Sequence, residues 1–456
     1  TFTILTVGDG LVSQIPALLI STATGMIVTR AASENNLSTD LSRQLVSFPV
    51  TFMISGGVLL LMCLIPGLPV PLLILAGGGM IFLGWRMERG KQKKEKEEEV
   101  VLPPSETEFY KNPENVYTLL NIDPIEMEFG YSLLPLVDEK KGGKLVERIV
   151  ILRKQFATEM GMVIPSVRLR DNTGLRPNEY VIKLKGEGVA RGEVLVDHFL
   201  VMGAEEDKEI DGIDTVEPAF GIPAKWIDQQ TREKAEVLGY TVIDPLSVIV
   251  THLSETVRRH AYELLGRRDV HQLLDNVKKS DKFLVEDFIP SVVSLEEFQR
   301  VLCNLLFEQI SIRDIPTILE TLGQYATTVK DPDILTEYVR QALKRTITHK
   351  YSEDGTLKVI TLTPELENLI MNHVKKNDRG SFITMEPETM HKILAVHKKE
   401  VAKIASIVKE PVVLTSPIVR LYYRKLIEEF IPDSTVLSYN EIESDIKVMA
   451  VGSIAI

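Results

Sequence analysis

The chain has 456 residues, a formal net charge of −12 and only two cysteines. Its length allows several domains of about 150 residues each, and its acidic balance argues against a nucleic-acid partner, which usually announces itself with a basic domain. Cys63 lies in an apolar stretch and Cys303 in an amphipathic one, so the sequence argues against disulfides and against a cysteine-based zinc site, and it suits a reducing cytoplasm.

Residues 1–47 form an apolar, membrane-proximal segment that polar residues interrupt. Its uncharged part, 11–29, is long enough to span a bilayer, and it could equally lie bent at the membrane face. Asp9 places a carboxylate beside membrane sequence, where charge is costly and usually functional. An equally weighted interpretation is that Asp9 shapes a turn at the aqueous edge. Because the chain begins without Met and in apolar sequence, we expect further membrane helices to precede it.

Residues 48–85 are predicted to form a transmembrane helical hairpin. The stretches 48–65 and 68–85 carry no charge, and each is near the roughly 17–25 residues that a helix needs to cross hydrocarbon. Arg86 and several further Lys and Arg residues follow the second stretch, and short flanks rich in these residues stay in the cytoplasm. We therefore expect the whole C-terminal part of the chain on the cytoplasmic side.

The second predicted span contains the run Gly77-Gly78-Gly79. A phosphate-binding loop would continue with Lys and Ser or Thr, which this run lacks. Small residues in membrane helices allow two helices to approach closely, and helix packing is the favoured interpretation.

Residues 86–122 are predicted to be a charged linker. Charges of both signs are dense in 86–99, which is typical of a solvated helix or a tether, and Pro103 prevents a helix from continuing. Phe109 and Tyr110 are apolar anchors within this linker.

From residue 123 onward, strand and helix patterns alternate. Apolar residues at helical spacing predict a helix over 145–160. Asp244 and Pro245 are a good N-cap and first residue for a helix over 246–265. Strand-like patterns cover 125–137, 164–170, 179–185 and 194–202.

Beyond Gly266 the chain becomes helical, and Ser294 with Glu297 forms a capping box for a helix that ends near residue 309. Asp354-Gly355 is predicted to be a hairpin turn that opens a final α/β unit. The remaining predicted elements are helices over 315–327, 333–346, 387–408 and 417–430, a helix opening at Pro364, and strands over 356–363, 411–415, 434–439 and 445–450.

Catalytic chemistry finds no positive support in the sequence. The motifs G-x-S-x-G, H-E-x-x-H and C-x-x-C are all missing. His252, His260 and His271 are not spaced as a compact ligand set, and we interpret them as surface or core histidines. The sequence therefore predicts neither an enzyme nor a cofactor.

Residues 215–226 combine aromatic side chains with chain-breaking residues. Phe220 and Trp226 lie in a stretch that Pro218, Gly221 and Pro223 interrupt, so it cannot be one regular helix or strand. Its aromatic residues could line a binding groove, where such side chains often dominate affinity. On sequence pattern alone, burial in a core is the more common outcome.

Several stretches resemble one known family. TFTILTVGDGLVSQIPALLISTATGMIVTRAA, at the start of the chain, resembles the membrane-proximal segment of the FHIPEP family, the large export-gate subunits of type III secretion. EFGYSLLPLVD, TVEPAFGIPAKWI, GYTVIDPLSVIVTHLSE and ISIRDIPTILETL are similar to segments of its flagellar branch, in the same order. The resemblance implies a fragment that contains the last two membrane helices, the linker and the complete cytoplasmic domain.

The resemblance also implies a non-enzymatic function. Members form a ring, typically nonameric, in the bacterial inner membrane, as multi-pass proteins with a large cytoplasmic C-terminal domain. That domain receives export chaperones with bound flagellar substrates, and the gate uses proton motive force for translocation. Implied partners are therefore chaperone–substrate complexes, other export-apparatus subunits, further copies of the chain and membrane lipid, without nucleic acid.

Site residues follow from the resemblance as well. The family's chaperone-binding depression falls on Glu217, Phe220 and Thr251, with Trp226 nearby. The family pattern has Asp where this chain has Glu217, so the carboxylate is carried on a longer arm and its hydrogen bonding is open. By the same resemblance, Phe109 and Tyr110 would dock on a neighbouring subunit, and Asp9 is a candidate for proton coupling.

The fold class implied is an α+β multidomain cytoplasmic region attached to transmembrane α-helices. It comprises α/β, inserted α/β, all-α and C-terminal α/β subdomains, and the clefts between them are expected to open and close. Their expected bounds are 123–195 with 245–264 for subdomain 1, 196–244 for inserted subdomain 2, 265–344 for helical subdomain 3, and 345–456 for subdomain 4 and the tail.

Three alternatives stay open at the level of the sequence. A virulence injectisome homologue would share the fold and the ring but carry different cargo. A membrane-tethered enzyme would bind a nucleotide or a metal ion. A secondary transporter with a regulatory tail would export no protein.

Overall fold

The structure is a computed structural model. It describes residues 49–64, 71–82, 84–85, 122–138, 142–203, 210–377, 380–404, 408 and 410–456, with eight further positions between residues 12 and 24. The chain divides into two compact units, Thr1–Asn121 and Ile122–Ile456.

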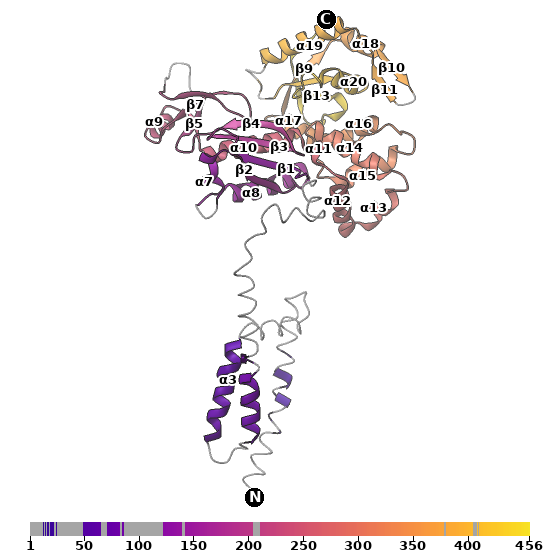
Figure 1. Ribbon diagram of the computed structural model, residues 1–456. Helices are drawn as coiled ribbons and strands as arrows, with labels where there is room; N and C mark the ends of the chain where they lie inside the picture. Colours follow the sequence, from indigo (N-terminus) through magenta and orange to yellow (C-terminus); the bar gives the residue numbers. More distant parts are fainter. Residues whose placement is uncertain are drawn as a thin grey trace, which may run out of the picture. The chain divides into compact units, whose positions relative to one another are not determined.

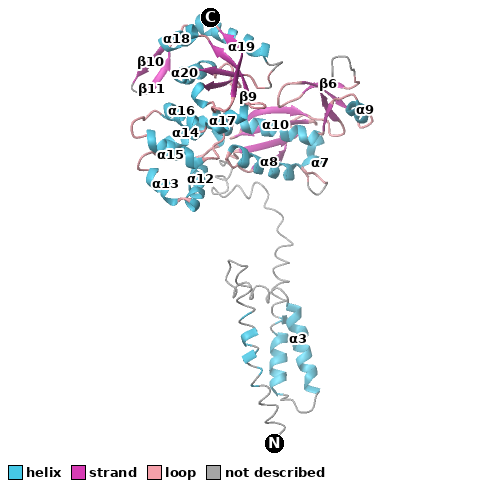
Figure 2. Ribbon diagram, turned by 180° about the vertical axis from the view of Figure 1, so that it is seen from behind, coloured by secondary structure: helices cyan, strands magenta, loops and turns pink. Residues whose placement is uncertain are grey.

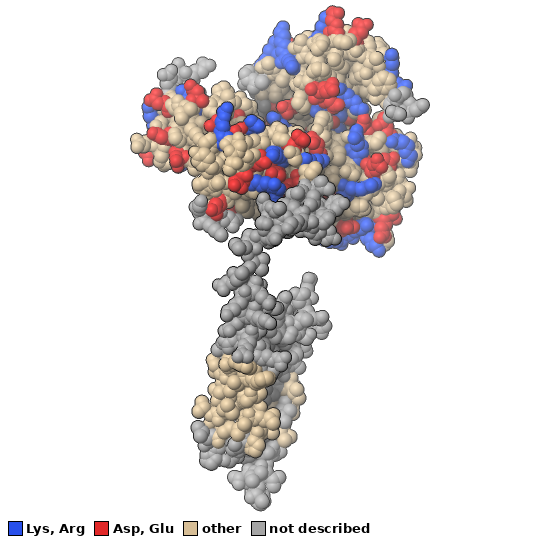
Figure 3. Space-filling model, in the orientation of Figure 1, with Lys and Arg blue, Asp and Glu red and all other residues tan. Residues whose placement is uncertain are grey.

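In the first unit, two helices lie side by side (Figure 1). The helix α3 (Pro49–Leu61) continues into the 3-10 turn η1 (Met62–Leu64), and residues 71–82 and 84–85 are also helical. The described side chains of these helices are uncharged (Figure 3), and several large ones are exposed, such as Leu75 with 80% of its surface accessible. No helix among the described residues combines the length and the apolar character that a membrane crossing requires. The transmembrane hairpin over 48–85 therefore stays a prediction.

Glycines set the distance between these two helices. A Cβ atom on Gly56 would lie 2.7 Å from the carbonyl oxygen of Gly77, and one on Gly77 would lie 2.9 Å from that of Gly56. No atom lies within 4 Å of a Cβ built on Gly78 or Gly79. The predicted close helix approach is confirmed at Gly77, where the backbones leave no room for a side chain.

The second unit begins with a mixed four-stranded sheet of order β2-β1-β3-β4, which we call the first sheet. β1 is parallel to β2 and antiparallel to β3, and the helices α8 and α10 pack against each other beside it. Lys185 and Gly186 both have positive φ and form the tight turn between β3 and β4. The bounds are β1 Ile125–Phe129, η3 Tyr131–Leu133, α7 Leu134–Val137, α8 Leu145–Met160, β2 Val167–Asp171, β3 Glu179–Leu184, β4 Glu187–Glu193 and α10 Pro245–Arg259.

Between β4 and α10 the chain builds a second, antiparallel sheet of order β6-β7-β5-β8, the inserted sheet, which stands to one side of the unit (Figures 1 and 2). Its strand β7 alternates between two cores. Ala224 and Trp226 pack into the large core of the unit, whereas Ile227 packs into a small core of its own. The bounds are β5 Phe199–Met202, β6 Ile213–Val216, β7 Pro223–Ile227, α9 Arg232–Val237 and β8 Thr241–Ile243.

A helical region follows α10, and sequence signals account for several of its helix starts. The predicted capping box of Ser294 and Glu297 is present, and Asp244, Asp314 and Asp331 each cap a helix that begins with or near a proline. The bounds are α11 Ala261–Leu264, α12 Arg267–Ser280, α13 Lys282–Phe288, α14 Leu295–Phe307, α15 Ile315–Tyr325, α16 Pro332–Ala342 and α17 Lys344–Tyr351.

The chain ends in a parallel sheet of order β13-β12-β9-β14, the C-terminal sheet, surrounded by helices (Figure 2). One face of this sheet joins the large core through Val359 and Leu414, and the other packs a separate core with α18, α19 and α20. The bounds are β9 Thr356–Leu362, α18 Pro364–Asn372, β10 Val374–Asn377, β11 Gly380–Ile383, α19 Pro387–Ile404, β12 Val412–Thr415, α20 Pro417–Ile427, β13 Thr435–Ser438, η5 Tyr439–Glu441 and β14 Lys447–Ile454.

Three predicted elements differ from the structure. The strand predicted over 194–202 is β5 alone, because His198 turns back to Leu195 through a backbone hydrogen bond. The helix predicted over 246–265 is interrupted at His260, whose backbone leaves the helical conformation and whose carbonyl accepts a hydrogen bond from the N–H of Glu263 at the start of the short helix α11. The strand-like pattern over 125–137 forms a strand only as far as Phe129, and the 3-10 turn η3 and the short helix α7 follow it.

Candidate functional site

The segment between β6 and β7 is a turn locked by one buried carboxylate. Glu217 has only 3% of its surface exposed. The backbone N–H of Ala219 donates to its Oε1 at 3.0 Å, and that of Phe220 donates to its Oε2 at 2.7 Å. Its own backbone N–H donates to the carbonyl of Ile222 at 2.8 Å, and the N–H of Gly221 donates to its carbonyl at 2.9 Å. We call residues 217–222 the Glu217 turn.

This turn holds apolar side chains in solvent. Phe220 is 55% exposed and Ile222 is 44% exposed, although both side chains are large and apolar. Gly221 follows Phe220 with φ +69°, a conformation that glycine adopts readily. Because two charge-assisted hydrogen bonds fix the backbone from below, Phe220 is presented on a rigid support. Rigid, exposed aromatic side chains are typical of recognition surfaces.

A buried tyrosine–histidine pair is influenced by the charge of Glu217. Tyr180 on β3 shares a hydrogen bond of 2.8 Å with Nδ1 of His252 on α10, and the rings meet edge to face with centroids 5.7 Å apart. Burial raises the pKa of Tyr180, and the charge of Glu217 raises it further. Burial lowers the pKa of His252, while the same carboxylate opposes that shift. Glu217 is thus within electrostatic range of both rings.

A glycine makes room for this pair. A Cβ atom on Gly192 in β4 would lie 2.5 Å from the hydroxyl oxygen of Tyr180, so only glycine allows the phenol to reach His252. Sequence analysis missed Tyr180 and Gly192, because a tyrosine in a strand and a glycine in its partner strand carry no pattern that links them to residue 217.

The other predicted site residues fall in different environments. Thr251 is exposed on α10, where it directly precedes His252. Trp226, by contrast, is 4% exposed and belongs to the large core. Its burial leaves it no contact surface, because inward alternation along β7 turns it away from solvent. Asp9, Phe109 and Tyr110 lie outside the described residues.

A second feature, which sequence analysis did not anticipate, is a buried ionic cluster where the helical region meets the C-terminal sheet. Arg340 on α16 and Arg420 on α20 are each 1% exposed. Arg340 donates to Glu308 at 3.0 Å and to Glu441 at 2.5 Å. Arg420 donates to Glu308 at 2.7 Å and binds Glu337 with two guanidinium nitrogens. We call these five residues the ionic joint.

The carboxylates of the ionic joint have shifted acidity. Burial raises the pKa of Glu308, but the charges of Arg340 and Arg420 outweigh it and lower that pKa to about 2. For Glu337, burial prevails over the two arginines and the pKa is raised. In the ionic joint Glu308 therefore stays negatively charged, whereas Glu337 takes up a proton more readily than Glu308 does.

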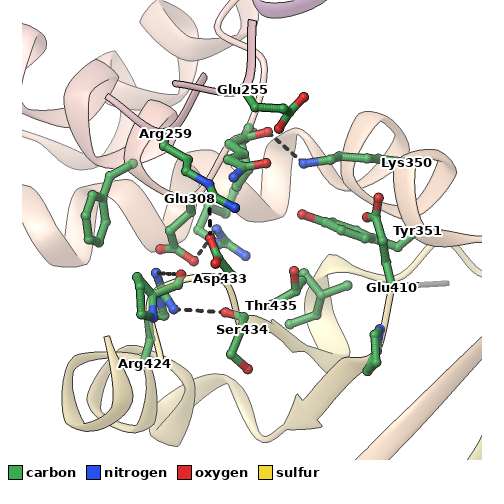
Figure 4. A pocket seen from close by; sticks show the side chains of 17 residues that line it. Glu255, Arg259, Glu308, Lys350, Tyr351, Glu410, Arg424, Asp433, Ser434 and Thr435 are labelled. Carbon is green, nitrogen blue, oxygen red and sulfur yellow. Dashed lines mark hydrogen bonds and ion pairs between the residues drawn. The ribbon is translucent and has the colours of Figure 1, made fainter. Parts of the chain in front are cut away.

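Two polar cavities flank this joint. One, of about 290 Å³, is drawn in Figure 4, where Arg424 lies beside Glu308 and Ser434. The other, of about 310 Å³, has Cys303 and Lys425 in its wall. Phe307, Glu308 and Arg424 line both, and the Arg424 guanidinium lies over the Phe307 ring at 5.5 Å. Both cavities have cationic and carboxylate side chains in their walls. The charge of the walls therefore favours neither an anionic nor a cationic ligand.

Comparisons with known proteins define the class. The model of the FHIPEP family matches residues 1–447, so the chain belongs to the FHIPEP family. The chain is 45% identical to the flagellar biosynthesis protein FlhA of Bacillus subtilis over 457 residues, which cover 100% of this chain and 68% of that protein. It spans about two thirds of the length of the curated relatives that it matches.

Solved structures share the fold. The CdsV protein of Chlamydia pneumoniae aligns with a TM-score of 0.67 and 31% identity, over 73% of this chain and 98% of that one. The same protein in a complex with CdsO gives a TM-score of 0.67 at 29% identity, over 74% and 98%. The nonameric EscV cytosolic domain from the type III secretion system shares the fold alone, with a TM-score of 0.60 at 24% identity, over 74% and 98%.

These matches confirm the family recognised in the sequence and the mixed α/β fold of its secretion domains. The flagellar relatives, together with the secretion structures, make the chain a component of the flagellar type III protein export gate. The family and its flagellar relatives are components of the export apparatus.

The ionic joint leads to a stability prediction. Glu441→Gln removes one negative charge from beside Arg340, both fully buried, and should lower the free energy of unfolding by about 3–5 kcal/mol, because a buried charge is left without its partner. Urea unfolding followed by circular dichroism measures the change. Glu388→Gln, which breaks only the exposed pair with Lys392, is the matched control, and equal losses in the two variants would contradict the assignment.

A second prediction concerns acid. Glu308 has a folded pKa of about 2 against an ordinary 4.5, so its contribution to stability is complete above pH 4.5 and is lost as the pH falls toward 2. Glu308→Gln should flatten the fall in unfolding free energy across this window, measured by urea unfolding at a series of pH values. A slope identical to that of the unchanged protein would show that Glu308 does not carry the acid sensitivity.

Proposed function

We propose that the Glu217 turn and Thr251 form the surface on which export chaperones, loaded with flagellar substrates, dock to this gate component. The main support for this proposal is that Phe220 is exposed and that the buried Glu217 carboxylate fixes the backbone of its turn. The longer Glu side chain still delivers its carboxylate to the turn amides. The departure from the family's Asp therefore leaves a rigid site.

Energetics support recognition at this turn. A large aromatic side chain that is exposed in the free protein gains most when a partner covers it, and the fixed backbone means that little conformational freedom is lost on binding. Thr251 adds a hydroxyl on the neighbouring helix α10, where it can accept or donate a hydrogen bond. In this proposal Trp226 supports the surface from the core and does not touch the partner.

We further propose that the chain is a multi-pass protein of the bacterial inner membrane with its second unit in the cytoplasm. The uncharged hairpin over 48–85, the Gly56–Gly77 contact and the basic residues after Trp85 support this. We propose as well that the chain associates with further copies of itself into a ring, with Phe109 and Tyr110 docking on the neighbouring copy. A contact with another secretion subunit is proposed by analogy with the complex of CdsV and CdsO.

The docking proposal predicts a loss of partner affinity. Phe220→Ala should weaken binding of a purified flagellar chaperone–substrate complex by about 2 kcal/mol, or roughly thirtyfold, because it removes the central aromatic contact. Titration calorimetry with the detergent-solubilised chain measures the affinity. Val237→Ala is the matched control, since Val237 lies in the same inserted region and is 87% exposed. Unchanged affinity for Phe220→Ala would refute the docking surface.

Proton-driven translocation is the last part of the proposal, and Asp9 is its candidate residue. Asp9→Asn keeps the shape of the side chain but cannot bind and release a proton, so the rate of substrate secretion and its dependence on the proton gradient should both fall. Secretion is measured in cells while an uncoupler lowers the gradient stepwise. Asp40→Asn, in the polar stretch of the same segment, is the control; if both variants secrete like the unchanged protein, Asp9 has no such role.

A further inference from the structure

The strand β6 is an edge strand of the inserted sheet. Of the strands that the structure describes, only β7 pairs with it, so its outer side is not paired with any of them. Ile213 and Val216 in β6 are 56% and 60% exposed, although both side chains are large and apolar. The docking proposal uses Phe220 and Thr251, and it leaves this edge without a role.

The register with β7 shows which backbone groups of β6 point outward. The N–H of Glu217 donates to the carbonyl of Ile222 at 2.8 Å, so these two residues form a hydrogen-bonded pair. Opposed residues of antiparallel strands alternate between hydrogen-bonded and non-hydrogen-bonded pairs. Val216, which lies opposite Pro223, and Asp214 therefore belong to non-hydrogen-bonded pairs. Their N–H and carbonyl groups point away from β7, and Pro223, which has no N–H, suits this arrangement.

Other edge strands of the second unit are protected against a further strand. β2 carries Arg168 and Arg170, and the pairs of β4 with β3 and of β14 with β9 each contain a register shift. Charged side chains and bulges are devices that keep edges from pairing. β6 keeps its register with β7 through all four of its residues, and Asp214 is its only charged residue. Of these edges, β6 is therefore the most open to strand addition.

The region around β6 is strongly acidic. Residues 196–244 contain twelve Asp and Glu but only four Lys and Arg, so this region carries −8 of the chain's formal charge of −12. Asp211 and Asp214, just before and within β6, are both exposed. A negative field attracts cationic partners and repels acidic ones. A partner that lies along β6 should therefore carry Lys or Arg.

We propose that β6 binds an extended, basic segment of the export chaperone as an additional strand of the inserted sheet. The segment pairs with the backbone groups of Asp214 and Val216, and its alternate apolar side chains cover Ile213 and Val216. This inference rests on the proposed function, because β6 leads directly into the Glu217 turn, on which the chaperone is proposed to dock. A strand added to β6 continues along the hairpin toward Phe220, so one partner can cover both.

Proline substitution tests strand addition. Val216→Pro removes an outward N–H and leaves the hydrogen bonds to β7 in place, whereas Val216→Ala shortens the side chain and keeps the N–H. Val216→Pro should lower the affinity for a purified chaperone–substrate complex about tenfold, and Val216→Ala should lower it by less than about threefold. Titration calorimetry with the detergent-solubilised chain measures both affinities. Equal affinities of the two variants would overturn backbone pairing at this edge.

The edge strand β4 provides the matched control for proline. The N–H of Val194 donates to the carbonyl of Asn178 at 3.0 Å, and the same alternation makes Arg191, three residues earlier, a residue whose N–H points outward. Arg191→Pro should leave the affinity unchanged. A loss as large as that of Val216→Pro would show that proline acts on the protein in general, and it would overturn the assignment to β6.

A charge reversal tests the edge without proline. Asp214 and Asp275 are both exposed carboxylates beside a lysine, 3.5 Å from Lys225 and 3.7 Å from Lys278, respectively. Asp214→Lys should weaken binding of the complex about fivefold, because it repels a basic segment, and the difference should shrink as the salt concentration rises. Asp275→Lys should not change the affinity. Equal affinities of these two variants would overturn the basic character of the bound segment.

Other occupants of the edge give different results. The chaperone without substrate should also lose affinity in Val216→Pro; a loss confined to the loaded complex would assign the strand to the substrate and overturn the chaperone as its source. A synthetic peptide of residues 86–96, a basic stretch of this chain, should not displace the chaperone. Val216→Pro should keep the mass of the solubilised protein, measured by sedimentation. Displacement by the peptide, or a smaller mass, would assign the edge to the chain itself and overturn the proposal.

The same measurements separate this proposal from the docking function. If Phe220→Ala abolishes binding while Val216→Pro and Asp214→Lys bind like the unchanged chain, the docking turn stands and the added strand fails. If Phe220→Ala binds normally while Val216→Pro still weakens binding, the docking turn fails and the added strand stands.

Discussion

Two buried guanidinium groups hold the helical region and the C-terminal sheet together. Arg340 and Arg420 reach Glu308 at the end of α14, and each also binds a second carboxylate. Removing ions from water is expensive, and the cost is recovered only where the partners are placed well and satisfy one another's hydrogen bonds. The large core continues past this joint from α14 into the C-terminal sheet. Apolar packing alone could join the helical region and the C-terminal sheet in several ways. The ionic joint specifies one of these arrangements.

The Glu217 turn uses a buried charge for a different purpose. Its carboxylate binds backbone amides of its own turn, and the result is an apolar side chain held in water. The alternation along β7 makes this possible, since Trp226 anchors the inserted sheet in the large core only a few residues from the exposed Phe220. The strand β7, which is packed in the core, therefore follows directly on a turn whose apolar side chains are exposed and available for binding.

Much of the local structure followed from short sequence signals. The capping box at Ser294, the Asp244-Pro245 start of α10 and the apolar spacing of α8 each involve residues within one or two helical turns, and all three are confirmed. Glu217 and Phe220 were predicted as site residues from the family resemblance. The structure shows that the Glu217 carboxylate binds the backbone N–H of Phe220. The ionic joint escaped notice because its members are up to 133 residues apart, from Glu308 to Glu441, and a charged residue on a helix normally indicates a solvated face.

The sequence by itself determined the family, the uncharged hairpin stretches, most helix starts and the position of the candidate docking turn. These properties depend on composition and on neighbours along the chain, where physical preference acts over a few residues. Only the tertiary structure decided that Trp226 is core, that Gly77 and not Gly79 meets Gly56, and that Tyr180, Gly192 and His252 lie together. Each of these outcomes depends on which faces of distant elements meet, and strand register and helix rotation fix that only when the chain folds.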